Sequence, residues 1–109
     1  MVRPVSSIRN LGPASEAAFA RAGILSAEEL VALGPDAAYR RLLQAGGRPH
    51  FIGYYVLVMG LQGRPWNDCQ GAEKAALRVR FDALRAEFAE DRSAGIEAAL
   101  DAIGVGRRR

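Results

Sequence analysis

The chain has 109 residues, of which 50% are apolar and 7% aromatic, and a formal net charge of +3. This length supports one hydrophobic core, so we expect a single domain over residues 1–109. The lone cysteine, Cys69, excludes an internal disulfide and a cysteine-rich zinc site. Because Ala is abundant, Val and Ile are sparse and Thr is absent, the composition predicts an all-α fold.

The charge distribution is a weak signal for nucleic-acid binding. Residues 1–65 contain seven Arg and four acidic residues, whereas basic and acidic residues balance in 66–109. Without Arg107, Arg108 and Arg109 the whole chain is neutral. A frayed, charged terminus therefore explains the basic tail, residues 105–109, better than a specific DNA contact.

The first feature along the chain is a turn between two predicted helices, residues 6–10 and 13–22. Gly12 would supply the positive φ of a tight turn, Pro13 suits the first helical position, and Gly23 fits a left-handed exit. This pattern is typical of a helix-hairpin-helix unit, whose turn amides can bind a phosphate. The same pattern also begins and ends ordinary helices. The candidate phosphate-binding or partner-binding residues are Arg9, Asn10, Gly12, Pro13, Ala14, Ser15 and Arg21.

Two further helices are predicted before residue 47. Ser26 and Glu29 have the spacing of a capping box, in which each side chain satisfies the other residue's backbone donor. They predict a helix over residues 27–33. Leu33-Gly34-Pro35 then opens a fourth helix, which Gly46 closes. The likeness of Leu33-Gly34-Pro35 to Leu11-Gly12-Pro13 fits either a doubled helix-hairpin-helix or the general preferences for Pro and Gly at helix ends.

Residues 49–62 have no polar face, so they must be surrounded and form the central core element. A buried strand is the alternative, but the length of the segment favours a helix. Residues 63–68 then form a turn in which Trp66 is a large aromatic anchor. The longest apolar stretch, 51–61, is too short to span a membrane.

The last segment has an amphipathic stripe that begins after Ala72. Arg78 and Asp82 form a pair on its other face. We expect an interruption at residues 93–95, followed by a short apolar set at Ile96, Leu100 and Ile103, which brings the total to five to seven helices. The stripe either covers the same core, which we favour, or pairs with a partner or a second copy in a homodimer. Its residues are Leu77, Phe81, Leu84 and Phe88.

Residues for catalysis are sparse. His50 is the only histidine and stands at a predicted helix start, and Cys69 is interpreted as a small packing residue. No nucleotide loop, catalytic triad or metal-ligand set is visible. We therefore expect no enzyme activity, catalytic residue, cofactor or metal. The opening residues lack the apolar run of a signal peptide, which favours the cytoplasm.

The order of the motifs resembles the C-terminal domain of the TfoX/Sxy competence-regulator family over about residues 6–76. The matching segments are 8–16, 22–24, 29–34, 38–42 and 63–67. The resemblance implies a small helix-hairpin-helix or SAM-like fold, a role in bacterial transcription of DNA-uptake genes, and no catalytic residues. Fuller members carry a preceding α/β domain. Only five residues precede the match here, so we expect a stand-alone domain with a helical extension over 77–104.

Two functions follow from these patterns. The first is a non-enzymatic regulatory module that binds a protein of the transcription machinery. The alternative is weak, salt-sensitive DNA binding through the turn at Gly12. Ala14 stands where a phosphate-binding hairpin often carries Lys, and measurable DNA binding needs several phosphate contacts. The protein partner is therefore the preferred hypothesis.

Overall fold

The computed structural model describes the backbone of residues 2–102 and the side chains of residues 2–89. This part of the chain is all-helical, as the composition predicted, but it contains four α-helices rather than five to seven. Two 3-10 turns accompany them. The elements in chain order are η1 (Val5–Ser7), α1 (Pro13–Arg21), α2 (Ala27–Gln44), α3 (Phe51–Leu61), η2 (Trp66–Asp68) and α4 (Gly71–Ala102).

The helix count is lower for three reasons. The break predicted at Gly34 is confirmed, since Gly34 has a non-helical φ of 82° and ψ of 168°, but the two helices that meet at this kink are counted as one element, α2. The predicted interruption at residues 93–95 is wrong, since α4 continues to Ala102. One glycine costs a helix only about 1 kcal/mol relative to Ala, and the surrounding Ala and Glu residues favour the helix. The predicted helix over 6–10 is a single 3-10 turn, Val5–Ser7.

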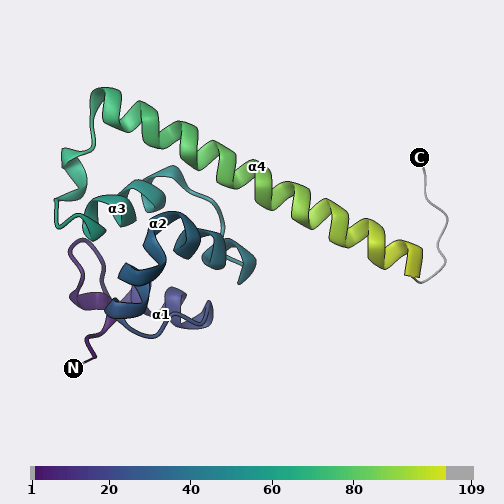
Figure 1. The fold of residues 1–109 in the computed structure, drawn as a ribbon, viewed down its shortest axis with the longest axis horizontal. Coiled ribbons are helices and arrows are strands. Elements are labelled where there is room, and N and C mark those ends of the chain that lie inside the picture. Colours follow the sequence, from purple (N-terminus) through teal and green to yellow (C-terminus); the bar gives the residue numbers. More distant parts are fainter. Residues whose placement is uncertain (1, 103–109) are drawn as a thin grey trace.

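Helix α3 lies at the centre of the core. Tyr54 and Met59 are fully buried, and Leu57 is 2% exposed. Figure 1 shows α1, α2 and α3 gathered in one cluster, with α4 lying across it and running past its edge. The prediction that residues 49–62 form a central helix, and not a strand, is confirmed.

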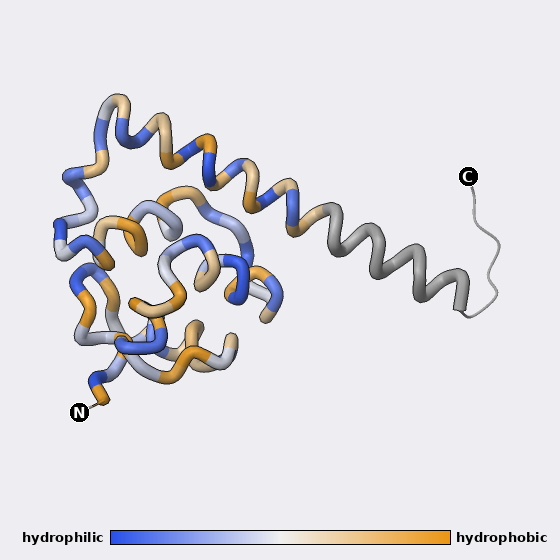
Figure 2. The backbone as a smooth tube through the Cα atoms, viewed as in Figure 1, coloured by the Kyte–Doolittle hydropathy of each residue, from blue (hydrophilic) through white to orange (hydrophobic). Residues whose placement is uncertain are grey.

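The apolar stripe of α4 packs on this same core. Leu77, Phe81 and Leu84 are each less than 5% exposed, and Phe88 is partly buried against them. Figure 2 shows apolar and hydrophilic residues alternating along the first turns of α4. On the outer face, Arg78 pairs with Asp82 at 3.2 Å, as predicted. The side chains of Ile96 and Leu100, and all of Ile103 and the tail 105–109, lie outside the described residues.

One carboxylate connects three helices. Asp36 of α2 accepts hydrogen bonds from the Tyr54 hydroxyl of α3 and from the Arg80 guanidinium of α4, the latter at 2.7 Å. Burial alone would raise the pKa of Asp36, but these two hydrogen bonds lower it below its usual range. The carboxylate is therefore ionised at neutral pH, and it fixes α4 against the α2–α3 pair.

Two local predictions need correction. Ser26 caps α2 as expected, accepting a hydrogen bond from the Glu29 amide at 3.1 Å. The Glu29 carboxylate, however, accepts from the Leu25 amide at 2.7 Å and not from that of Ser26, because it reaches one residue further back. Trp66 is 48% exposed and is not an anchor. Cys69 is 3% exposed, as expected for a small packing residue.

Candidate partner-binding site

A turn precedes α1 as predicted, but it follows a 3-10 turn and not a helix, and its left-handed residue is Asn10 and not Gly12. Asn10 has a φ of 72°, whereas Gly12 is an extended helix cap with a φ of −132°. The Asn10 side chain explains the difference, since its amide nitrogen donates to the carbonyl oxygens of Val56 at 3.3 Å and Arg64 at 2.9 Å. Asn tolerates this conformation better than most residues. The side-chain amide of Asn10 is therefore used inside the chain, and so is the backbone amide of Leu11, which donates to the Ile8 carbonyl at 3.1 Å.

Gly60 permits the hairpin to approach α3. A Cβ atom at Gly60 would lie 2.3 Å from the carbonyl oxygen of Arg9, closer than any real contact. The hairpin backbone thus packs directly on the helix. Sequence reasoning missed this role, although a glycine near the end of an apolar helix is a known signal for close backbone approach.

The start of α1 is a poor phosphate site. Pro13 occupies the first helical turn as predicted, and Gly12 provides no side-chain cap. Glu16 lies in this turn, and its carboxylate accepts from the Ser6 amide at 3.3 Å. That carboxylate already occupies the positive end of the helix and would repel a phosphate.

The predicted hairpin residues divide between two surfaces. Arg9, Pro13 and Ala14 are exposed at the turn. Ser15 lines a cavity on the other side of α1. Arg21 ends α1, about 12 Å along the axis from the first turn at 1.5 Å per residue. These residues therefore do not form one compact site.

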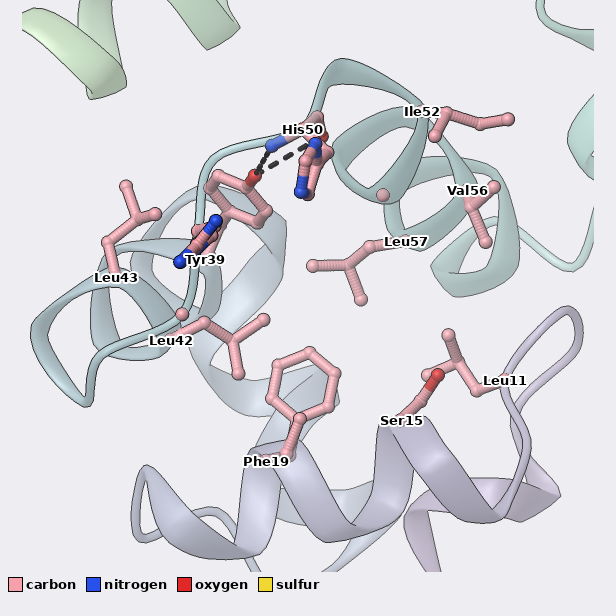
Figure 3. A pocket seen from close by; sticks show the side chains of 14 residues that line it. Leu11, Ser15, Phe19, Tyr39, Leu42, Leu43, His50, Ile52, Val56 and Leu57 are labelled. Carbon is pink, nitrogen blue, oxygen red and sulfur yellow. Dashed lines mark hydrogen bonds between the residues drawn. The ribbon is translucent and has the colours of Figure 1, made fainter.

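An apolar cavity of about 310 Å³ opens between α1, the second half of α2 and the start of α3. Figure 3 shows Phe19, Leu42 and Leu57 facing it, with Leu11 and Ser15 at the α1 side. Its lining is almost entirely apolar. The remaining lining residues are Ala18, Tyr39, Leu43, Gly47, Arg48, His50, Ile52, Gly53 and Val56.

Tyr39 holds one end of this cavity in place. Its hydroxyl accepts a hydrogen bond from the His50 amide at 3.0 Å and donates one to the His50 carbonyl at 3.2 Å (Figure 3). Burial raises the pKa of Tyr39, so the hydroxyl stays protonated and keeps both bonds at neutral pH. The loop between α2 and α3 is thereby fixed at the cavity wall. His50 acts there through its backbone, and its side chain is exposed.

Among the described residues, no three His, Cys, Asp or Glu side chains gather into a metal site. Burial raises the pKa of the Cys69 thiol, which disfavours the reactive thiolate. In the same part of the chain, no helix is long and apolar enough to cross a membrane.

Comparison with known families shows to which family the chain belongs. The sequence model of the TfoX C-terminal domain matches residues 1–81. The chain belongs to the TfoX C-terminal domain family. The resemblance over residues 6–76 is thus confirmed, and the TfoX match reaches five residues further, to Phe81 inside α4. Neither the curated proteins nor the solved structures compared with the chain give a match, so the helix-hairpin-helix or SAM-like assignment stays a prediction.

Proposed function

We propose that this chain is a non-enzymatic, cytoplasmic regulatory module that acts in bacterial transcription or competence by binding a protein partner. Membership of the TfoX C-terminal domain family supports the regulatory role. The open apolar cavity between α1, α2 and α3 supports the binding mode and is the observation on which the proposal depends.

The cavity fits a partner because part of its apolar lining is open to water: Ile52 is 55% exposed, and Leu42 and Val56 are half-buried. Covering such surface contributes roughly 25 cal/mol per Å². Ligand-binding clefts typically measure about 300–1,000 Å³, so this cavity of about 310 Å³ lies at the lower end of that range. It is large enough for a few apolar side chains of a second protein.

The hairpin supports direct DNA binding less well. The Asn10 side-chain amide is engaged with Val56 and Arg64, and the Leu11 backbone amide donates to the Ile8 carbonyl. The carboxylate of Glu16 stands in the first turn of α1. Arg9 is the one exposed cation that the turn offers among the described residues. One cation supplies too few phosphate contacts for measurable affinity at physiological salt.

A pair of alanines on α1 tests the proposal. Ala18 lines the cavity, whereas Ala17 is exposed and does not. Both Ala→Leu changes keep a strong helix former. We expect Ala18→Leu, introduced in the native host, to abolish regulation of the target genes in a transcript measurement, and Ala17→Leu to preserve it.

Equal regulation by both variants at equal protein level would contradict a role for the cavity. A titration with duplex DNA at two salt concentrations examines the alternative. Binding that weakens steeply with salt, and weakens further in Arg9→Ala, would favour DNA binding through the hairpin over a protein partner.

A further inference from the structure

We infer that the partner segment seated in the cavity between α1, α2 and α3 is an acidic amphipathic helix. This inference rests on the proposed function and specifies the chemistry of the partner. It is drawn from the charges at and around the cavity, its almost entirely apolar lining, and the secondary structure of its walls.

The carboxylates of the described side chains are already engaged. Each of the eight acidic residues between positions 2 and 89 accepts at least one hydrogen bond or forms an ion pair within the chain. Six arginines are their ion-pair partners. These are Arg3, Arg40, Arg64, Arg78, Arg80 and Arg85.

Three of the remaining arginines lie at the cavity or at two depressions that continue from it through shared lining residues. Arg48 lines both the cavity and the depression next to it, which also includes Gln44. Arg21 and Arg41 border a further depression that contains the same Gln44. All three arginines are exposed, and within the described residues no carboxylate pairs with them. They form a basic border along the ends of α1 and α2.

Helix dipoles explain part of this border but not all of it. Arg21 and Arg41 lie in the last turns of α1 and α2, where a cation is favourable. Arg48 belongs to no helix, and its position has no such explanation. A helix dipole does not neutralise a guanidinium group. All three arginines therefore keep their positive charge and attract an external acidic group.

The arrangement of charge distinguishes a protein segment from a small acidic ligand. Arg48 is the one arginine in the cavity lining, whose other side chains include Phe19 and Leu57. Arg21 and Arg41 lie beyond the cavity at a further depression, so the positive charge extends past the space that a small carboxylate would fill. An elongated segment with apolar residues on one side and carboxylates on the other matches this pattern.

The form of the segment follows from the walls of the cavity. An extended peptide is bound by adding a strand to a sheet edge or, as a polyproline helix, in an aromatic-lined groove. The described residues contain no strand, and the lining of the cavity is mostly aliphatic. A helix that inserts apolar residues at positions i, i+3 or i+4, and i+7 needs only an apolar groove. The three helical walls provide one.

A display library of random 16-residue peptides tests this inference. The purified full chain is the target, and an excess of the Ala18→Leu variant removes peptides that bind elsewhere. We expect the surviving peptides to be enriched in Asp and Glu and to carry apolar residues at helical spacing. Neutral or basic survivors, or no enrichment over the Ala18→Leu competitor, would overturn the inference.

Charge removal then locates the contact for one selected peptide. Arg48→Gln should weaken its binding about threefold in fluorescence anisotropy, because one exposed ion pair is lost. Arg85→Gln is the matched control, since Arg85 is exposed on α4, lines none of these depressions, and leaves Asp82 paired with Arg78. Equal weakening in both variants would indicate general electrostatic attraction and contradict the basic border.

These outcomes separate the inference from the proposed function. If Ala18→Leu abolishes regulation in the host while the library yields no acidic peptides, the cavity binds a partner of another chemistry. If Ala18→Leu regulates normally, the proposed function itself fails.

Discussion

Phe81 of α4 offers the sharpest test of how the stripe is used. Its side chain is 2% exposed. Its ring centroid lies 6.0 Å from that of Tyr39, 5.5 Å from that of Phe51 and 6.0 Å from that of Tyr54. Phe81→Ala removes these contacts and leaves a cavity, which typically costs about 3–5 kcal/mol. The total free energy of unfolding of a domain of this size is about 5–15 kcal/mol. We therefore expect Phe81→Ala to lose a large share of it.

Urea denaturation followed by circular dichroism measures this loss. Val79→Ala on the same helix is the control, because Val79 is 70% exposed and its truncation should change the free energy of unfolding by less than about 0.5 kcal/mol. Light scattering on the same samples reports the oligomeric state. A Phe81→Ala protein that unfolds at the wild-type urea concentration, but changes from dimer to monomer, would refute intramolecular packing of the stripe.

Two further predictions concern the packing around α3. Gly60→Ala should destabilise the protein by about 1–3 kcal/mol, because the new Cβ would collide with the Arg9 carbonyl. Gly53→Ala on the same helix meets open space and should stabilise it by about 0.5–1 kcal/mol. A Gly60→Ala protein at least as stable as the wild type in urea denaturation would contradict the close approach. The lowered pKa of Asp36 means that its bonds stabilise the fold above about pH 4 and are lost as the pH falls further. Asp36→Asn should therefore show a smaller loss of stability on acidification to pH 2, and an unchanged acid slope would exclude this linkage.

The helix boundaries could be predicted from the sequence because they depend on local chemistry. Pro13 begins α1, Gly23 follows its end with a φ of 84°, and the apolar face around Phe81 marks α4 as a surface helix. These signals act within a few residues. Ser93–Gly95 was misinterpreted because one glycine among good helix formers is too weak to end a helix.

The arrangement of the candidate site could not be predicted in the same way. The left-handed residue of the turn is Asn10, and not Gly12 as predicted. The Asn10 side chain finds two carbonyl acceptors, at Val56 and Arg64, that lie more than 40 residues away in the sequence. The cavity likewise depends on how α1, α2 and α3 meet, and Tyr39 holds its wall through the backbone of His50. Periodicity identifies which residues are apolar. It does not show where their packing leaves an opening.

Crosslinking in living cells of the native host tests the central claim most directly. A photoreactive amino acid replaces Ile52, which lines the cavity and is 55% exposed, or Val79, which is 70% exposed on α4. The account predicts a protein adduct after illumination at position 52, none at position 79, and loss of the adduct when Ala18→Leu is added. An equal adduct at both positions, or one at position 52 that survives Ala18→Leu, would contradict a partner seated in the cavity.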